Sequence, residues 1–257
     1  MTHAGLAVPA AVFGPEAAAG SAHALVFAPV TPRWDDGAFF APVTNVLVQA
    51  GLRVTVVDTL SLWDERIDSM ASFVARCRTL LTRYGPVDLL CGNALGGAVA
   101  QALLPDTTPT TAALLVSGPA RTDGLLESRL TQIADLAADG RSDYALALLN
   151  RRIQPHGRRP ATDGDRPGPH DPSAARRLAA GMRLLCGIDV SDGVEAHPGP
   201  LLQIVGSHSQ LVTQRHTAAA PHHRVHVIPG AGMRPHFEST AEVSALVGAF
   251  LREKGLI

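Results

Sequence analysis

The segment with the clearest chemical meaning is residues 91–97, Cys-Gly-Asn-Ala-Leu-Gly-Gly, which directly follows the apolar run Val87 to Leu90. In the pattern G-x-S-x-G, a serine on a tight turn between a strand and a helix attacks a carbonyl carbon, and its small neighbours let the two backbones approach closely. Here the central position is Ala94. Because a methyl group can neither attack a carbonyl nor be activated by a base, this turn has the frame for a nucleophile without the nucleophile.

The elements around this turn follow the pattern of a mostly parallel sheet. Short apolar runs alternate with longer stretches of helical periodicity, as in sheets whose strands are joined by crossover helices. The predicted strands are Ala24 to Val30, Arg53 to Asp58, Val87 to Cys91, Ala112 to Ser117, Leu201 to Val205 and Arg224 to Ile228. The predicted helices between them are Phe40 to Ala50, Ile67 to Tyr84, Leu95 to Leu104 and Thr240 to Lys254. The segment before Ala22 predicts an antiparallel hairpin at the edge of the sheet.

Residues 120–194 interrupt this alternation. They hold helical patterns but no strand pattern, and the predicted helices are Leu125 to Ala138, Tyr144 to Arg152 and Ser173 to Leu185. Between the last two, Gln154 to Pro172 is dense in Pro, Gly, Arg and Asp, which predicts an irregular loop or a mobile lid. We therefore expect a core of residues 1–119 and 195–257. Residues 120–194 would form a helical cap that lines one apolar cavity above the carboxyl ends of the strands.

Composition limits the class of partner. With 257 residues, 46% of them hydrophobic and 18% charged, the chain can bury the core of one large domain. A formal net charge of -1 argues against nucleic acids and anionic membranes as partners and favours an apolar small-molecule substrate. Three widely spaced cysteines, without zinc-ligand spacing, predict reduced thiols and neither a metal nor a cofactor. The N-terminus lacks a basic region before its interrupted apolar stretch, so we expect a cytoplasmic protein. Oligomeric state is not predicted.

Four motifs occur in an order and spacing that resemble the α/β-hydrolase superfamily over nearly the whole chain. Residues 92–97 resemble its G-N-S-L-G-G elbow, and residues 200–206, Pro-Leu-Leu-Gln-Ile-Val-Gly, resemble its P-x-L-x-I-x-G strand. Residues 227–232, Val-Ile-Pro-Gly-Ala-Gly, resemble the run before the catalytic histidine, and residues 235–238, Pro-His-Phe-Glu, the segment after it. The resemblance is strongest to small members with a cap, such as carbon-carbon bond hydrolases and menaquinone-pathway lyases. It implies a mostly parallel, doubly wound α/β sheet with a helical cap insertion.

The resemblance also locates the catalytic positions, and each of them is substituted. The nucleophile position is Ala94, and the acid position, three residues after Gly206, is Ser209 with His208 beside it. The base position, directly after the Pro-Gly-Ala-Gly run, is Met233. The His-Gly pair that helps to shape the family's oxyanion hole is also missing, because residues 28–31 are Ala-Pro-Val-Thr. The chain is therefore expected to lack a standard Ser-Asp-His triad.

Two histidines are candidates for an acid-base group. His236 could be a base displaced by one turn into the following helix, or it could pack beneath the site as a structural residue. His208 lies on a loop expected to face the pocket, where it could be functional or merely solvated.

The acidic candidates also have ordinary structural interpretations. Asp123 could be an acid relocated to the preceding strand end, although an aspartate before a helix is more often an N-cap. Asp35 and Asp36, next to Trp34, could be pocket acids or residues of a solvated turn. Two further pairs, His222-His223 and Arg158-Arg159, are expected to be solvent-facing loop residues.

The turn can still do chemistry without a nucleophile. The backbone N-H of Leu95 would lie at a helix N-terminus, and a second N-H from around Thr31 could complete a clamp for a carbonyl oxygen. We expect Thr31, Trp34 and Asn93 to contact the substrate. These parts predict a non-hydrolytic cyclase, lyase or isomerase for an apolar carbonyl compound, in bacterial specialised metabolism of a polyketide-like kind.

Two alternatives stay open at this point. One is a serine hydrolase, namely an esterase, thioesterase or carbon-carbon hydrolase, present as an inactive Ser-to-Ala variant at position 94. The other is a pseudoenzyme that binds a ligand or partner without catalysis. The first explains Ala94 easily and Met233 poorly, and the second explains the losses but not the retained turn.

Overall fold

The computed structural model describes residues 8–16, 22–158 and 171–257. Within these residues the strands form one seven-stranded sheet in the order β1-β3-β2-β4-β5-β6-β7. The strands are β1 (Ala10–Phe13), β2 (His23–Phe27), β3 (Arg53–Val57), β4 (Leu89–Asn93), β5 (Ala112–Val116), β6 (Leu201–Gly206) and β7 (Arg224–Ile228). All neighbours are parallel except β1, which runs antiparallel to β3 at the sheet edge. The predicted α/β class and all six predicted strands are confirmed.

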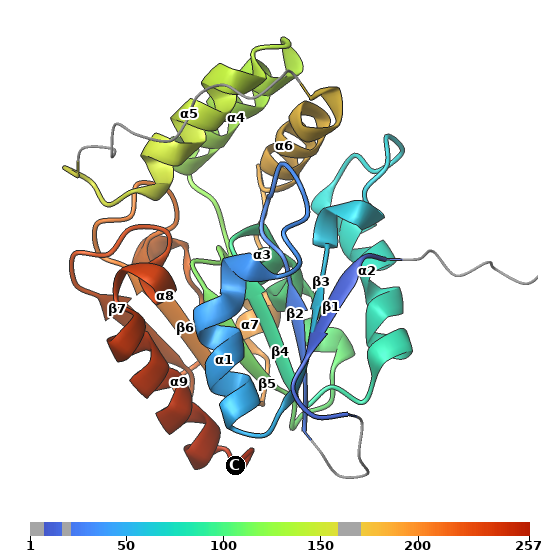
Figure 1. Cartoon of the computed structure of the whole chain (residues 1–257), viewed down its shortest axis with the longest axis vertical. Coiled ribbons are helices and arrows are strands. Elements are labelled where there is room, and N and C mark those ends of the chain that lie inside the picture. The colour runs from blue at the N-terminus through green and yellow to red at the C-terminus, as the bar shows by residue number, and fades with distance from the viewer. Residues whose placement is uncertain (1–7, 17–21, 159–170) are drawn as a thin grey trace, which may run out of the picture.

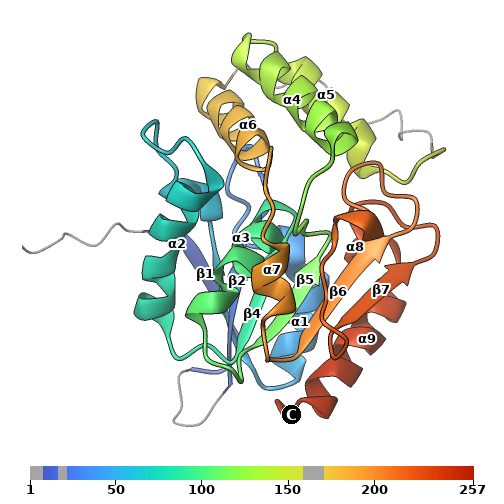
Figure 2. The same ribbon diagram turned by 180° about the vertical axis from the view of Figure 1, so that it is seen from behind.

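Helices cover both faces of the sheet (Figures 1 and 2). On one face lie α1 (Ala41–Gln49) and α9 (Thr240–Glu253), and on the other lie α2 (Met70–Tyr84), α3 (Leu95–Leu103) and the short α7 (Ser191–Glu195). Each face buries its own hydrophobic cluster against the sheet. The strands read as continuous apolar runs because both of their faces are covered. No helix in the described parts of the chain is long and apolar enough to cross a bilayer.

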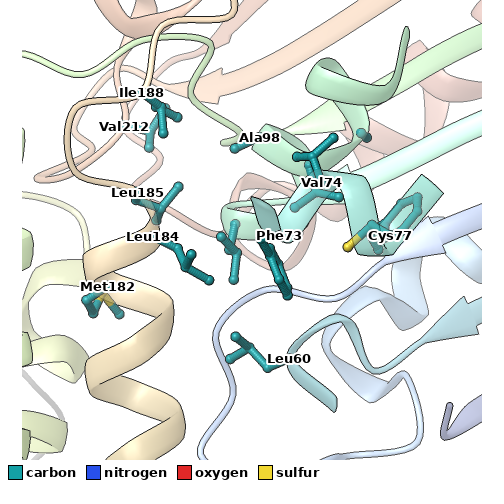
Figure 3. Packing of buried hydrophobic residues seen from close by; sticks show 14 of the residues in the cluster. Leu60, Phe73, Val74, Cys77, Ala98, Met182, Leu184, Leu185, Ile188 and Val212 are labelled. Atoms are coloured by element: carbon teal, nitrogen blue, oxygen red, sulfur yellow. The ribbon is translucent and has the colours of Figure 1, made fainter. Parts of the chain in front are cut away.

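Three further helices lie above the carboxyl ends of the strands, namely α4 (Gly124–Ala138), α5 (Ser142–Ile153) and α6 (Pro172–Leu184). They pack mainly on one another. Leu184 of α6 and Leu185 directly after it point toward Phe73 and Val74 of α2, whereas Met182 lies on the other side of α6 (Figure 3). We call these three helices the α4–α6 layer. The structure has a further helix at the end of residues 120–194 that was not predicted, α7, and it packs on α3 and on the 3-10 turn η3 (Leu104–Asp106).

Two expectations differ from the structure in detail. The N-terminal edge strand pairs with β3 rather than forming a hairpin with its sequence neighbour, because β2 is paired on both sides by β3 and β4. The predicted strand Ala24 to Val30 ends at Phe27, after which residues 28–37 form an irregular loop. Most of the predicted loop Gln154 to Pro172 lies outside the described residues, and its first part, 154–158, is not helical.

The backbones of β2, β4, β5 and α3 approach one another closely where the strands end. A Cβ atom on Gly96 would lie 2.0 Å from the Phe27 carbonyl oxygen, and one on Gly92 would lie 2.2 Å from the Gly96 carbonyl oxygen. On the other side, a Cβ on Gly97 would lie 2.6 Å from the Gly118 Cα. These distances are too short for any side chain, so glycine is required for α3 to begin where it does.

Replacing Gly96 by Ala should therefore destabilise the fold by several kcal/mol, since backbone atoms cannot move away as a flexible side chain can. The matched control is Gly124→Ala, at the start of α4, where a Cβ would meet no atom within 4 Å. That variant should be neutral or more stable by up to about 1 kcal/mol. Urea denaturation of both variants measures the difference, and equal midpoints would contradict the packing described here.

Candidate functional site

The turn between β4 and α3 has the strained geometry of a nucleophile elbow although its central residue is alanine. Ala94 adopts φ 49° and ψ −114°, a conformation that costs a non-glycine residue about 1–3 kcal/mol. Its N-H bonds the Val116 carbonyl of β5 at 3.1 Å, and its carbonyl accepts from Ala98 at 3.0 Å, so neighbouring elements hold the strain. Leu95 is the first residue of α3, where a backbone N-H has no intrahelical acceptor and the helix dipole is positive. The predicted oxyanion donor is thus at a helix N-terminus.

A cavity of about 440 Å³ lies between this turn and the α4–α6 layer. Its floor contains Asn93 and Ala94 from the turn, one wall comes from the loop after β2, and its roof comes from the α4–α6 layer. The lining is mainly apolar. It includes Leu126, Leu130, Leu146, Leu149, Ile153, Met182, Leu185, Leu211, Val212, Met233 and Phe237. Such a chamber suits a flexible, mostly apolar small molecule.

Met233 fills the position where the resemblance places the base. Its N-H donates to the Ile153 carbonyl at 3.1 Å, and its sulfur accepts the Val212 N-H at 3.3 Å. The neighbouring Gly232 is pressed against residues 153–155, since a Cβ there would lie 2.7 Å from the Pro155 nitrogen. The end of α5 therefore closes over this segment, and a thioether lines the cavity in place of an imidazole.

The acid position lies outside this cavity. Ser209 and His208 line a second cavity of about 340 Å³, and the Ser209 hydroxyl accepts the Leu211 N-H at 3.3 Å. The His208 ring is exposed, and its backbone bonds Ala231 and His156 at 2.8 Å. The structure thus does not bring His208 to the cavity that contains Ala94, contrary to the orientation expected for its loop.

His236 is also away from the cavity that contains Ala94. The side chain is fully buried between α8 (Pro235–Glu238) and η1 (Ala38–Phe40), where Nε2 donates to the Phe39 carbonyl at 2.8 Å. Burial lowers the pKa of His236 to about 4, so its ring is neutral at physiological pH. In this place His236 ties the C-terminal segment to the loop after β2, which is the structural role considered for it from the sequence.

Of the three residues predicted to contact substrate, two line the cavity that contains Ala94 and one does not. Thr31 and Asn93 line the cavity, whereas Trp34 packs against the hydrophobic cluster on the α1 and α9 face. The Asn93 amide nitrogen donates to the Val116 carbonyl at 2.8 Å, which commits it to holding β4 and β5 together. The Thr31 hydroxyl is buried and has no hydrogen-bond partner among the described residues. Among these three, Thr31 has the side-chain donor available for a ligand.

The remaining sequence candidates have structural partners. Asp123 is the N-cap of α4, as its structural interpretation predicts, and accepts the Leu126 N-H at 2.8 Å. Asp35 lines the cavity, but its two oxygens accept the Gly37 and Phe39 N-H groups. Asp36 is exposed.

The two pairs expected to face solvent fare differently. His222 is exposed, but His223 is buried, which corrects the prediction, because Nε2 lies 3.0 Å from the His197 carbonyl oxygen beneath it. Arg158 is exposed, and Arg159 lies outside the described residues.

One element of the site was missed in the sequence. Arg177 of α6 forms two hydrogen bonds with Asp58, at 2.6 and 3.0 Å, and its Nε donates to the Thr31 carbonyl at 3.2 Å. Asp58 is 4% exposed and follows β3 directly. This ion pair joins the α4–α6 layer to the loop that carries Thr31. A lone aspartate at the carboxyl end of an apolar run was the available signal, but nothing in the sequence names its partner.

No protein-family model matches the sequence, and no curated protein matches it. Solved structures of several enzymes resemble the chain over nearly its whole length. An α/β-hydrolase enzyme from a Medee basin deep-sea metagenome library has a TM-score of 0.77 at 12% identity, over 95% of this chain and 94% of that one. An esterase from Exiguobacterium antarcticum has a TM-score of 0.71 at 13% identity, over 95% of both chains. A bromoperoxidase from Bacillus anthracis has a TM-score of 0.71 at 16% identity, also over 95% of both. The chain has the α/β-hydrolase fold.

The burial of His236 predicts a pH dependence of stability. Its pKa falls from 6.5 in the unfolded chain to about 4 in the fold, so the unfolded chain binds more protons between these values. Stability should drop by roughly 3 kcal/mol as the pH falls through this window, from this residue alone. Denaturant unfolding of His236→Gln, repeated from about pH 7 to about pH 4, should show a flatter dependence than the parent. His226→Gln, at a residue whose side chain is 39% exposed, controls for the substitution. A parental slope in His236→Gln would contradict the account.

The Arg177 and Asp58 pair predicts coupled substitutions. Asp58→Ala leaves a largely buried guanidinium unpaired and should cost about 2–4 kcal/mol, whereas adding Arg177→Met should restore part of that loss. A double-mutant cycle from thermal or urea unfolding measures the coupling. The exposed pair Arg183 and Asp135 supplies the control cycle, expected below about 1 kcal/mol. Equal coupling in the two pairs would show that α6 is not held by this contact.

Proposed function

We propose that this chain is a non-hydrolytic enzyme of the α/β-hydrolase fold that acts on an apolar, carbonyl-bearing small molecule. The observation that carries the proposal is that the turn has the geometry of a nucleophile elbow but no nucleophile. The strained geometry of Ala94 and the N-H of Leu95 are kept, while Ala94 and Met233, at the nucleophile and base positions, line an apolar cavity. The reactions that fit are ring closure, elimination and isomerisation, since they need a polarised carbonyl and a confined chain but no acyl-enzyme.

The chemistry assigned to the site is electrostatic and conformational. A carbonyl oxygen seated at the start of α3 would accept from Leu95, and charge that develops on it would be stabilised by a fixed dipole in an apolar chamber. The Thr31 hydroxyl would supply a second donor from the loop after β2. The side chains of the α4–α6 layer would fold a flexible chain into one reactive conformation. Polyketide-like chains combine such flexibility with repeated carbonyls.

A second candidate function is ligand binding without turnover. One observation favours it, namely that Asp35 is the one carboxylate among the described lining residues of this cavity and both of its oxygens accept backbone N-H groups. Proton transfer by a side chain therefore has no unoccupied carboxylate at hand. A reaction that relies on confinement and on Leu95 does not need one, so this observation is compatible with catalysis.

The test uses a poly-β-ketone chain carried as its N-acetylcysteamine thioester. The proposal expects conversion at least about tenfold above the buffer rate, with a product that has the mass of the substrate or lacks one water and keeps its thioester. Leu149→Trp, which fills the cavity from α5, should return the rate to that of buffer. Tight binding without acceleration would support the binding protein instead, and release of the free acid would support hydrolysis.

Ala94→Ser alone should not create an efficient esterase. A serine needs an imidazole to take its proton, and neither His208 nor His236 lines the cavity. Turnover of p-nitrophenyl butyrate by the variant should stay within about tenfold of the parent chain. Saturable hydrolysis far above that level would restore the interpretation as a serine hydrolase with a natural serine at position 94.

A further inference from the structure

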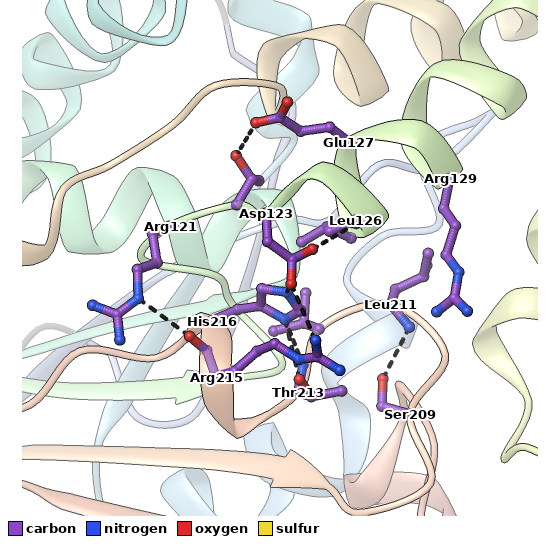
Figure 4. Close-up of polar contacts among 12 residues, drawn as sticks. Arg121, Asp123, Leu126, Glu127, Arg129, Ser209, Leu211, Thr213, Arg215 and His216 are labelled. Atoms are coloured by element: carbon purple, nitrogen blue, oxygen red, sulfur yellow. Dashed lines mark hydrogen bonds and ion pairs between the residues drawn. The ribbon is translucent and has the colours of Figure 1, made fainter.

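A second cavity lies beside the cavity that contains Ala94. It has a volume of about 340 Å³, and it is bounded by the start of α4, the loop after β6 and the 3-10 turn η4 (Gln214–His216). Leu126 and Leu211 line both cavities, so the two cavities adjoin at these side chains. Figure 4 shows the polar side chains of this region, with those of α4 above and those of η4 below.

The polar lining of the second cavity is rich in hydrogen-bond donors. Arg129 donates one N-H to the Gln210 carbonyl, and Arg215 donates one to Asp123 at 3.3 Å. Because a guanidinium has five N-H donors, most of those on both residues have no hydrogen-bond acceptor recorded within residues 8–16, 22–158 and 171–257. The exposed rings of His156 and His208 line the same cavity. The Ser209 hydroxyl, which accepts one bond, keeps its own proton to donate.

A single carboxylate, Asp123, opposes these groups within the described lining. It is occupied, since it accepts the Leu126 N-H and lies 3.3 Å from Arg215 and 3.2 Å from Nε2 of His216. Burial lowers the pKa of the His216 ring, which favours its neutral form. One carboxylate thus faces two arginines.

The excess of positive charge affects the pKa of Arg129. Its guanidinium has a lowered pKa, first because of burial and then because the charges of Arg152 and Arg215 repel its own. The amino end of the 15-residue helix α4 contributes Leu125 and Leu126 to the same cavity and adds its positive dipole. The cavity therefore has a positive charge that no described side chain balances.

We propose that the second cavity binds the anionic group, a carboxylate or a phosphate ester, of a ligand whose apolar part occupies the cavity above Ala94. The part concerning the apolar end rests on the proposed function. Arg129 and Arg215 would form charge-assisted hydrogen bonds with the anion, and Leu126 and Leu211 would contact the chain that joins the two ends. The substrate class is thereby narrowed to an acidic or phosphate-bearing carbonyl compound.

The experiment compares three ten-carbon probes, namely decanoate, decyl phosphate and 1-decanol, by isothermal titration calorimetry. The two anions should bind at least about tenfold more tightly than the alcohol, because each gains charge-assisted bonds. Tighter binding of decanoate would indicate a carboxylate ligand, and tighter binding of decyl phosphate would indicate a phosphate ester. In the double variant Arg129→Gln with Arg215→Gln, the preference should fall to within about threefold while decanol binding stays unchanged.

The matched control is Arg224→Gln, at the amino end of β7, which also removes an exposed arginine from an ion pair with a carboxylate. It should keep the parental preference. Circular dichroism checks that each variant is folded. If the double variant does not fold, the single variant Arg215→Gln replaces it, because the Arg215 side chain is 63% exposed.

The outcomes separate this proposal from the proposed function. Equal binding of anions and alcohol by the parent, or a preference that survives the double variant, overturns the anion site and leaves the apolar cavity standing. If no probe binds, the apolar cavity fails as a ligand site. Inorganic phosphate then tests the anion site alone, and it should raise the melting temperature of the parent but not of the double variant. An equal effect of phosphate on both overturns the inference.

Discussion

The arrangement depends on the contact between backbones at Gly92, Gly96 and Phe27. Because no side chain separates β2, β4 and α3 there, the helix begins directly above the strand ends, and Ala94 is forced into its left-handed conformation. The same approach places the start of α3 next to Ala94, which lines the cavity. Other folds can present a helix N-terminus to a ligand, but here the strain at Ala94 shows that the position of the turn is determined by its neighbours.

Around this frame, the substitutions are consistent with one another. Ala94 has no group for a base to activate, and the segment at the base position is bonded to the end of α5 through Met233. Ser209, at the acid position, faces a different cavity. A single engineered change at position 94 would leave the other two positions unexplained. The structure shows an apolar chamber, roofed by helices that the Arg177 and Asp58 ion pair joins to the core.

Much of the fold could be predicted from the sequence, because strand periodicity and the small residues of the turn reflect local constraints. The continuous apolar runs 112–116 and 201–206 are strands buried on both faces, as expected of a parallel sheet. Side-chain direction could not be predicted in the same way. Trp34 faces the core, His236 is buried under Phe39, and His208 faces a neighbouring cavity, and each depends on tertiary packing. The partner of Asp58 lies 119 residues away in the chain, so sequence reasoning could not find it.

The claim that Leu95 provides the carbonyl contact can be measured directly. With leucine labelled with ¹⁵N, and with Leu95→Met used to assign the signal, 2-decanone and decane are titrated into the protein. The account predicts that the ketone moves the Leu95 amide proton downfield, as a hydrogen bond to a carbonyl does, and that decane binds in the cavity without this shift. Binding of the ketone with no shift beyond that caused by decane would contradict it.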